Sequence, residues 1–349
     1  MNKLVLSLTF AFSLAVPLGY AVPAFAITLT QISTDFPSPI GIDHHEEGAV
    51  DRVVMSVYYS TGIPDNFVLV ASDGTQTPFT TVSGFTDEVK IATARTGSVF
   101  PAGTMFTGNG NDGEIVKISP DGTTVLDPWV TLSGAGNGLI RGSLYVDRTG
   151  VYGGDLIVVT TAGEVWRINS AGTPTFIADV DVHLEGVVTV PSDASYGPLS
   201  GKIIAGAEVP GLLYAFDSAG LDATYDVDVN IEDIDHITGT ENFYGVNYGT
   251  SNLLGSPASD FAPYAGEILL TEEFHSGSGL YHLFWDGSSL QAPEIPVEPP
   301  LPSLGVGQWE HVTFSSAGIV EIPPTDEVIG GEIIPINAAA LLIAGAQST

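Results

Sequence analysis

The chain has 349 residues, no cysteine, and 41 acidic against 9 basic side chains, for a formal net charge of −32 at pH 7. The lack of cysteine excludes disulfides, thiol catalysis, cysteine-ligated zinc and iron–sulfur clusters. A surface of this charge disfavours nucleic acids and anionic lipids, which are bound through cationic contacts; it suits divalent cations or simple solubility in salty water.

Residues 1–26 have the pattern of a secretory signal peptide. Lys3 supplies the positive start, residues 4–15 are apolar, and the small-x-small sequence at 24–26 predicts cleavage before Ile27. The alternative is a retained membrane anchor, against which the cleavage motif and the strand-like sequence that follows argue. We therefore expect an extracellular protein exported through a Sec-type signal peptide.

An apolar strand that ends in a glycine turn recurs through the middle of the chain. The steps between the turn glycines are 48, 50, 48 and 67 residues, for glycines at positions 74, 122, 172, 220 and 287. A repeat of about 40–50 residues with four short strands is typical of a β-propeller. Each glycine suits a hairpin turn that needs a positive φ. The longer last step indicates an insertion around Asn247–Pro263.

The predicted fold is all-β: a propeller over residues 27–322, with six blades of four-stranded antiparallel sheet. After the fifth repeat only Trp309–Phe314 and Gly318–Ile322 look like strands, so we expect an abbreviated last blade. The N-terminal strand Ile27–Ile32 can complete that blade, which hides sheet edges and closes the ring. Five blades are the alternative.

Residues 323–349 are predicted to form a flexible C-terminal tail. The apolar run Ala338–Ala346 has nine residues, too short to span a bilayer, which needs about 20. The segment Gly330–Ile336 and the Ala-Gly-Ala-Gln stretch that follows it resemble the juxtamembrane segment of cell-surface proteins from ammonia-oxidising archaea (Thaumarchaeota). That resemblance implies a cell-surface protein whose membrane helix is missing from this chain. The alternative is a tail that is merely disordered.

The starts of the predicted inner strands carry the candidate metal ligands. Glu88, Glu185 and Glu232 occupy equivalent positions in three blades, Glu310 is a less secure fourth, and Arg141 takes the same place in another blade. Carboxylates that face one another across an axis raise each other's pKa. A Ca²⁺ ion relieves this repulsion with hard oxygen ligands. The alternative is that Arg141 alone relieves part of the repulsion by forming a salt bridge.

Histidines next to these positions are the catalytic candidates. His183 lies two residues before Glu185, and His236 follows the acidic sequence that starts at Glu232. A histidine beside a metal-bound carboxylate is suited to act as a general base on a metal-activated water. The alternative is a structural role at a strand end. The spacing of a zinc motif such as H-E-x-x-H is absent, which argues against zinc.

The inner-strand starts 184–187 and 231–235 resemble those of calcium-dependent six-bladed propellers of the gluconolactonase/regucalcin, strictosidine-synthase-like and paraoxonase-like superfamily. The segment 113–122 fits that superfamily and also NHL-type propellers. The resemblance implies an axial Ca²⁺ held by Glu, Asn and Asp, and hydrolysis of lactones or esters over it. Glu185 or Glu232 would be the Glu ligand. The Asn ligands have no clear match; the candidates are Asn137, Asn242 and Asn247.

Two functions follow from these observations. The first is a secreted, cell-surface binding scaffold with Ca²⁺ in its central channel. Its partner would be an unknown extracellular ligand or small molecule, and it would contact the membrane only through the missing helix. The second is an extracellular Ca²⁺-dependent lactonase or esterase. An enzyme needs an open channel mouth, whereas a scaffold tolerates a mouth plugged by Trp309 or capped by the 247–263 insertion.

Overall fold

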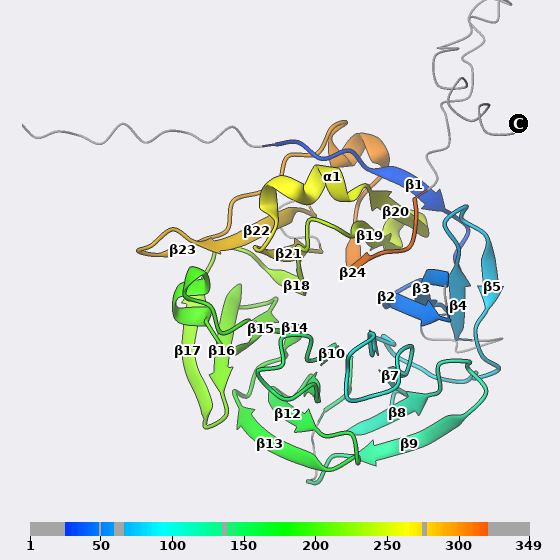
Figure 1. Cartoon of the computed structure of the whole chain (residues 1–349), viewed down its shortest axis with the longest axis vertical. Coiled ribbons are helices and arrows are strands. Elements are labelled where there is room, and N and C mark those ends of the chain that lie inside the picture. The colour runs from blue at the N-terminus through cyan, green and yellow to red at the C-terminus, as the bar shows by residue number, and fades with distance from the viewer. Residues whose placement is uncertain are drawn as a thin grey trace, which may run out of the picture.

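The computed structural model describes residues 25–319 except 49, 59–65, 135–137, 142 and 274–277. Six four-stranded antiparallel sheets surround a central axis (Figure 1), which confirms the six-bladed propeller and rules out five blades. The described helices are short, and none has both the length and the apolar character needed to cross a bilayer.

Blades 1 to 4 each use four consecutive strands, ordered along the chain from the axis outward. A short helix, η1 (Ala194–Leu199), interrupts blade 4 between its first two strands. The strands are, in blade 1, β2 (Ile42–Glu47), β3 (Val50–Ser56), β4 (Phe67–Val70) and β5 (Gln76–Pro78); in blade 2, β6 (Ile91–Thr93), β7 (Met105–Gly108), β8 (Glu114–Ile118) and β9 (Val125–Thr131); in blade 3, β10 (Ser143–Val146), β11 (Leu156–Val159), β12 (Glu164–Ile168) and β13 (Pro174–Asp179); and in blade 4, β14 (Glu185–Thr189), β15 (Ile203–Ala207), β16 (Leu212–Asp217) and β17 (Gly220–Asp226).

Blades 5 and 6 are interleaved along the chain. After the inner strand of blade 5, the chain builds the two middle strands of blade 6 and only then completes blade 5. The strands of blade 5 are β18 (Ile231–His236), β21 (Ile268–Glu272), β22 (Leu280–Trp285) and β23 (Leu290–Gln291); those of blade 6, from the axis outward, are β24 (Trp309–Ser315), β19 (Asn242–Asn247), β20 (Asn252–Ser256) and β1 (Thr30–Ser33); the connecting helices are η2 (Tyr248–Thr250), α1 (Ala258–Phe261), η3 (Ala262–Tyr264) and η4 (Leu301–Leu304).

Blade 6 corrects the prediction of an abbreviated last blade. The segment taken for an insertion at Asn247–Pro263 contains β20, so this blade has its full four strands. The prediction that the N-terminal strand closes the ring is confirmed, because β1 pairs antiparallel with β20. Of the strand expected at Gly318–Ile322, the first two residues are not in a strand, and the rest lies outside the described residues. Trp309 is fully buried against Phe243 inside blade 6.

The hydrophobic core lies between neighbouring blades. In its largest cluster, side chains of blades 3, 4 and 5 pack together, including the fully buried Ile157 and Ile204. Val246 of blade 6 and Met55 of blade 1 share another cluster, so the ring closes through an apolar interface. Each such buried side chain contributes about 1.5–3 kcal/mol, and these interfaces stabilise the chain without disulfides.

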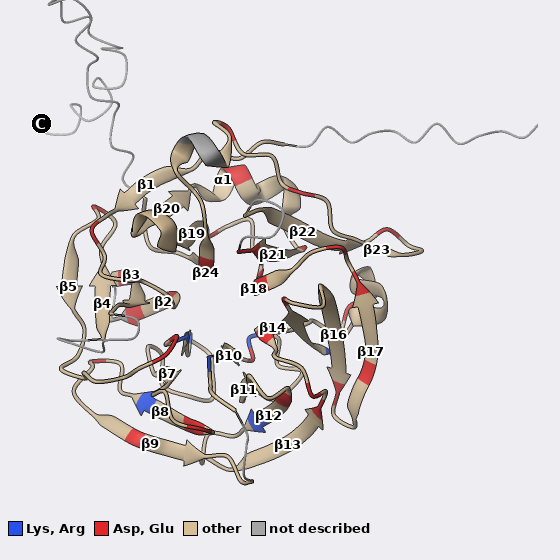
Figure 2. Cartoon of the chain, turned by 180° about the vertical axis from the view of Figure 1, so that it is seen from behind, with Lys and Arg blue, Asp and Glu red and all other residues tan. Residues whose placement is uncertain are grey.

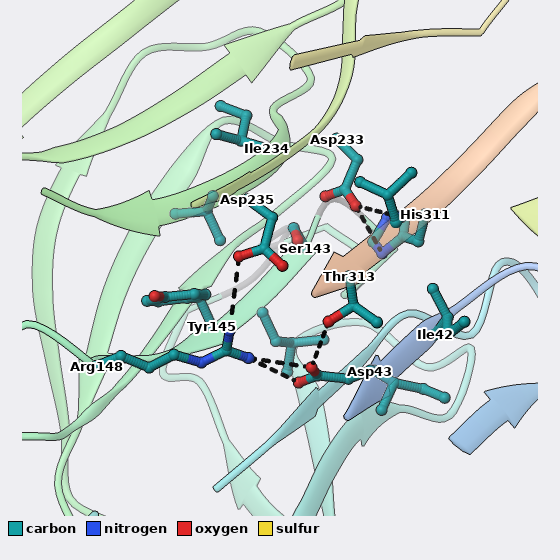
Figure 3. A pocket seen from close by; sticks show the side chains of 14 residues that line it. Ile42, Asp43, Ser143, Tyr145, Arg148, Asp233, Ile234, Asp235, His311 and Thr313 are labelled. Carbon is teal, nitrogen blue, oxygen red and sulfur yellow. Dashed lines mark hydrogen bonds and ion pairs between the residues drawn. The ribbon is translucent and has the colours of Figure 1, made fainter. Parts of the chain in front are cut away.

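Aspartates on the inner strands join neighbouring blades at the axis (Figure 3). Asp43 of blade 1 accepts hydrogen bonds from the backbone amide of Thr93 in blade 2 at 2.7 Å and from the hydroxyl of Thr313 in blade 6 at 3.0 Å. Asp235 of blade 5 accepts one from the backbone amide of Phe314 in blade 6 at 3.3 Å. Inner strands are sheet edges with unpaired backbone groups, and these carboxylates satisfy some of them.

Halfway along the axis the channel narrows to a small cavity. Arg148 enters the channel from the loop after β10 and pairs with Asp43 at 3.0 Å and Asp235 at 3.6 Å (Figure 3). The cavity beside these groups has a volume of about 20 Å³. That is room for about one water molecule, so no organic ligand fits in this cavity.

Candidate metal centre

The strand bounds agree with the predicted alignment of the inner-strand starts. Glu185 opens β14, and Glu232 and Glu310 are the second residues of β18 and β24. Glu88 and Arg141 lie just ahead of β6 and β10. These side chains gather at one mouth of the channel, which we call the glutamate mouth. Figure 2 shows acidic residues on β18 and β24 near the axis.

Three carboxylates at the glutamate mouth are placed to bind one ion. Glu185, Glu208 and Glu232 each offer one oxygen, and these oxygens lie within 4.8 Å of one another. The alignment missed Glu208 because it belongs to a second strand: it directly follows β15, which runs antiparallel to β14 and so ends beside Glu185. Glu273 directly follows β21 in the same way, and this shared position is the signal that would have revealed both.

β-Bulges occur at two of these inner-strand starts. The pairing of β14 with β15 skips Gly186, and the pairing of β18 with β21 skips Glu232. A bulge bends a strand and redirects its side chains. Gly186 has a φ of +61°, and a Cβ atom there would lie 2.8 Å from the Cα of Asp233. Glycine is therefore required for the close approach of these two inner strands.

We expect Gly186→Ala to lower the free energy of unfolding by about 3 kcal/mol, because a left-handed alanine costs roughly 1–2 kcal/mol and the clash with β18 adds to it. Gly266→Ala is the control, since Gly266 has a φ of +87° but no neighbouring atom lies within 4 Å of the position that an added Cβ would take. Urea denaturation of both variants measures the difference. Equal losses would show that the close approach is unimportant.

Lys90, which the sequence analysis overlooked, lies among the glutamates. It is fully buried, and its Nζ lies 2.7 Å from Oε1 of Glu232. Burial opposes the charged ammonium, but the carboxylates of Glu232, Glu88 and Glu310 outweigh it and raise the pKa of Lys90. The site therefore contains a permanent positive charge supplied by the chain itself.

Glu185 and Glu232 form an unequal pair. Burial, with the nearby charge of Glu232, raises the pKa of Glu185 to about 10. Burial acts the same way on Glu232, but Lys90 and a hydrogen bond from Glu185 together lower the pKa of Glu232 below its usual value. At neutral pH without a metal, Glu185 is therefore protonated and donates to the Glu232 carboxylate.

The remaining acids of the glutamate mouth are joined by Gln308. Its side-chain amide donates to Glu310 at 3.0 Å and also to Glu273. Burial raises the pKa of Glu310 well above its usual value, and it raises that of Glu273 to about 8. At neutral pH Glu273 is therefore mostly protonated.

Arg141 and Glu88 meet at the rim. Arg141 Nη2 lies 2.6 Å from Glu88 Oε1, and Nη1 lies 3.5 Å from Asp87. Glu88 therefore forms a salt bridge, and the three carboxylates that can share an ion do not include it or Glu310.

Only one of the two catalytic candidates reaches the glutamates. His183 Nε2 lies 3.2 Å from Glu185 Oε1, and burial together with Arg141 lowers the pKa of His183 to about 4. His236 ends β18, four residues beyond Glu232, which at about 3.3 Å per residue is roughly 13 Å along the axis. There its Nε2 donates to the carbonyl of Thr189 at 2.8 Å.

The two described asparagine candidates are not on inner strands. Asn242 and Asn247 begin and end β19, where they donate to the carbonyl of Ala317 at 2.8 Å and to the hydroxyl of Thr250 at 2.6 Å. Asn137 lies outside the described residues. Neither Asn242 nor Asn247 therefore provides the axial asparagine that the resemblance implies.

The donor set at the glutamate mouth fits a hard divalent cation such as Ca²⁺. Carboxylate oxygens are the ligands this ion prefers, and Glu185, Glu208 and Glu232 supply them from two blades. Because a ligand must be deprotonated, uptake of the ion releases the proton of Glu185. Lys90 neutralises part of the charge, which weakens the attraction for the ion.

We expect the metal-free protein to lose stability as the pH rises from about 5 toward 10. The pKa of Glu185 rises from 4.5 to about 10 on folding, so within this window the folded state holds a proton that the unfolded state has lost. The free energy of unfolding therefore falls as the pH rises. Melting temperatures in EDTA at pH 6 and pH 9 measure the loss. Glu185→Gln should flatten this slope; an unchanged slope in that variant would refute the assignment.

Comparison with known proteins identifies the fold. No family profile and no curated protein matches the sequence. A gluconolactonase-like crystal structure matches with a TM-score of 0.51 and 12% identity over 80% of this chain and 87% of its own. A chain of a nidogen–laminin complex has a TM-score of 0.49 and 11% identity over 80% and 86%. A gluconolactonase from Xanthomonas campestris has a TM-score of 0.47 and 14% identity over 80% and 86%. At 12% identity, the similarity to the first of these structures shows the propeller fold alone.

Proposed function

We propose that this protein is a secreted, cell-surface propeller that binds Ca²⁺ at the glutamate mouth and serves as an interaction scaffold. The observation that carries the proposal is the convergence of Glu185, Glu208 and Glu232 on one point, with their oxygens within 4.8 Å of one another. A divalent cation there would link blade 4 to blade 5 and stiffen the mouth.

The cell-surface location rests on the sequence. Residues 1–26 have the form of an export signal, and the segment 330–336 resembles a juxtamembrane segment of archaeal surface proteins. The surplus of acidic over basic side chains suits an extracellular protein that meets divalent cations, and it disfavours nucleic-acid partners.

The alternative is a Ca²⁺-dependent lactonase or esterase at the same mouth. A neutral His183 beside Glu185 favours it, because such an imidazole can take up a proton. A bound divalent ion would polarise a substrate carbonyl. The asparagines argue against it, since neither Asn242 nor Asn247 lies on an inner strand, where the resemblance implies an asparagine ligand.

Two measurements on the purified protein separate these functions. Isothermal titration with CaCl₂ should show saturable binding, and a panel of lactones and aryl esters should show no turnover that depends on Ca²⁺. Hydrolysis that EDTA abolishes and that His183→Asn removes would establish the enzyme instead. A titration without saturable binding would refute both.

A further inference from the structure

We propose that the mouth opposite the glutamates binds a small hydroxycarboxylate. The pocket there, which we call the arginine pocket, has a volume of about 320 Å³, and small-molecule sites usually occupy about 300–1,000 Å³. Most of its wall comes from the loops that follow the inner strands, at the far end of the axis from Glu232. The residues that the argument uses are Arg95, Tyr145, Arg148, Tyr196, His236 and Thr238.

The arginine pocket contrasts with the rest of the molecule in charge. Among the described residues, two guanidinium groups line it and no carboxylate does, although the chain has 41 acidic and only 9 basic residues. Three acids outside this pocket pair with them: Glu241 with Arg95 at 2.6 Å, and Asp43 and Asp235 with Arg148 at 3.0 and 3.6 Å. Acids on the outer strands act weakly here, because at 0.1 M salt charges are screened over about 10 Å. The wall of the arginine pocket therefore offers guanidinium donors and no carboxylate of its own.

Three donor atoms of residues that line the arginine pocket lack partners. Within the described part of the chain, the Nε atoms of Arg95 and Arg148 and the hydroxyl of Tyr145 are buried without a hydrogen bond. A buried donor without a partner is unfavourable, and a small side-chain movement toward a bound acceptor would give it one. A carboxylate, with two acceptor oxygens, is the group that suits guanidinium donors best.

The remaining wall suits a hydroxylated ligand body. Tyr196 and His236 meet edge to face, with ring centroids 6.5 Å apart, and present aromatic surface to the pocket. Because His236 Nε2 donates to the carbonyl of Thr189, its Nδ1 carries a lone pair that can accept a hydrogen bond from a hydroxyl. Thr238 Oγ1 accepts from the backbone amide of Glu241 at 3.1 Å, so its own hydrogen is left to donate.

The test compares D-glucuronate with D-glucose, which share the ring hydroxyls and differ in the carboxylate. Titration of the full chain in EDTA should show saturable glucuronate binding and glucose binding at least about tenfold weaker, or about 1.4 kcal/mol. The Glu185→Gln/Glu232→Gln variant should bind glucuronate as the parent does, which separates this site from the glutamate mouth. Equal binding of the two sugars, or none of glucuronate, would overturn the proposal.

Two variants place the ligand in the arginine pocket. Arg148→Gln removes the guanidinium and should weaken glucuronate binding at least about tenfold. Because Arg148 also pairs with Asp43 and Asp235, this variant risks misfolding. Tyr196→Ala removes only a partly exposed ring and should weaken binding about threefold or more. Unchanged affinity in folded Tyr196→Ala and Arg148→Gln would exclude this pocket.

Discussion

Replacing Lys90 with methionine is expected to lower the free energy of unfolding of the metal-free protein by about 3–5 kcal/mol, the usual cost of breaking a buried ion pair. Its Nζ lies 2.7 Å from Glu232, and both side chains are buried. Without the ammonium, the Glu232 carboxylate is left uncompensated beside Glu185 and Glu310. Urea denaturation in EDTA measures the loss.

Calcium gives this prediction a second readout. An ion at the glutamate mouth supplies the positive charge that Lys90→Met removes, so Ca²⁺ should stabilise this variant more than it stabilises the parent. Lys117→Met is the control, because Lys117 rests over the rings of Phe100 and Trp129 on blade 2, away from the glutamates. A Lys90→Met variant as stable as the parent in EDTA would contradict the role assigned to this ammonium.

Asp43→Ala is expected to cost about 3–5 kcal/mol of unfolding free energy for a related reason. The Asp43 carboxylate accepts hydrogen bonds from blades 2 and 6 and pairs with Arg148 of blade 3. Burial opposes its charge, but Arg148, Arg95 and backbone amides outweigh it and lower the pKa of Asp43 below 3.8. The contribution of the charged Asp43 carboxylate to the free energy of unfolding is therefore complete above pH 4. It is lost as the pH falls through that lowered pKa.

A turn aspartate provides the control for Asp43→Ala. Asp73 lies on the same blade, is exposed, and accepts a hydrogen bond from the backbone amide of Thr75 at 2.9 Å. Asp73→Ala should cost about 0.5–1.5 kcal/mol, as for an ordinary hydrogen bond. Denaturation curves of the two variants, recorded at pH 7, make the comparison. Similar losses would mean that the contacts between blades at the axis carry no special weight.

The sequence predicted the blades that are built locally. Strand, turn and strand recur with a nearly constant period in blades 1 to 4, where each strand pairs with its neighbour along the chain. The four strands of blade 6 were not all predicted because they are distant from one another in sequence. β19 and β20 interrupt blade 5, β24 follows it, and β1 comes from the N-terminus. An alternation of apolar residues identifies a strand but does not indicate with which distant strand that strand pairs.

The same limit applies to the candidate metal centre. Glu185 and Glu232 were found because the repeat places equivalent positions at one mouth. Lys90 was missed because it lies two residues beyond Glu88, in a position that is apolar or small in most blades. Glu208 was missed because it belongs to a second strand, whose return to the axis depends on the antiparallel pairing. The bulges at Gly186 and Glu232, which shift side-chain direction, leave no periodic signal.

The most direct test of the account is the melting temperature of the full chain with Ca²⁺ and with EDTA. At free Ca²⁺ one-hundredfold above Kd, binding stabilises the folded state by about 2.7 kcal/mol, a shift of several degrees. The Glu185→Gln/Glu232→Gln variant should lose this shift. Asp217→Asn/Asp222→Asn, which removes the same number of carboxyl groups from the partners of Lys202 on blade 4, should keep it. An absent shift in the parent, or an equal shift in the glutamate variant, would contradict a calcium site at the glutamate mouth.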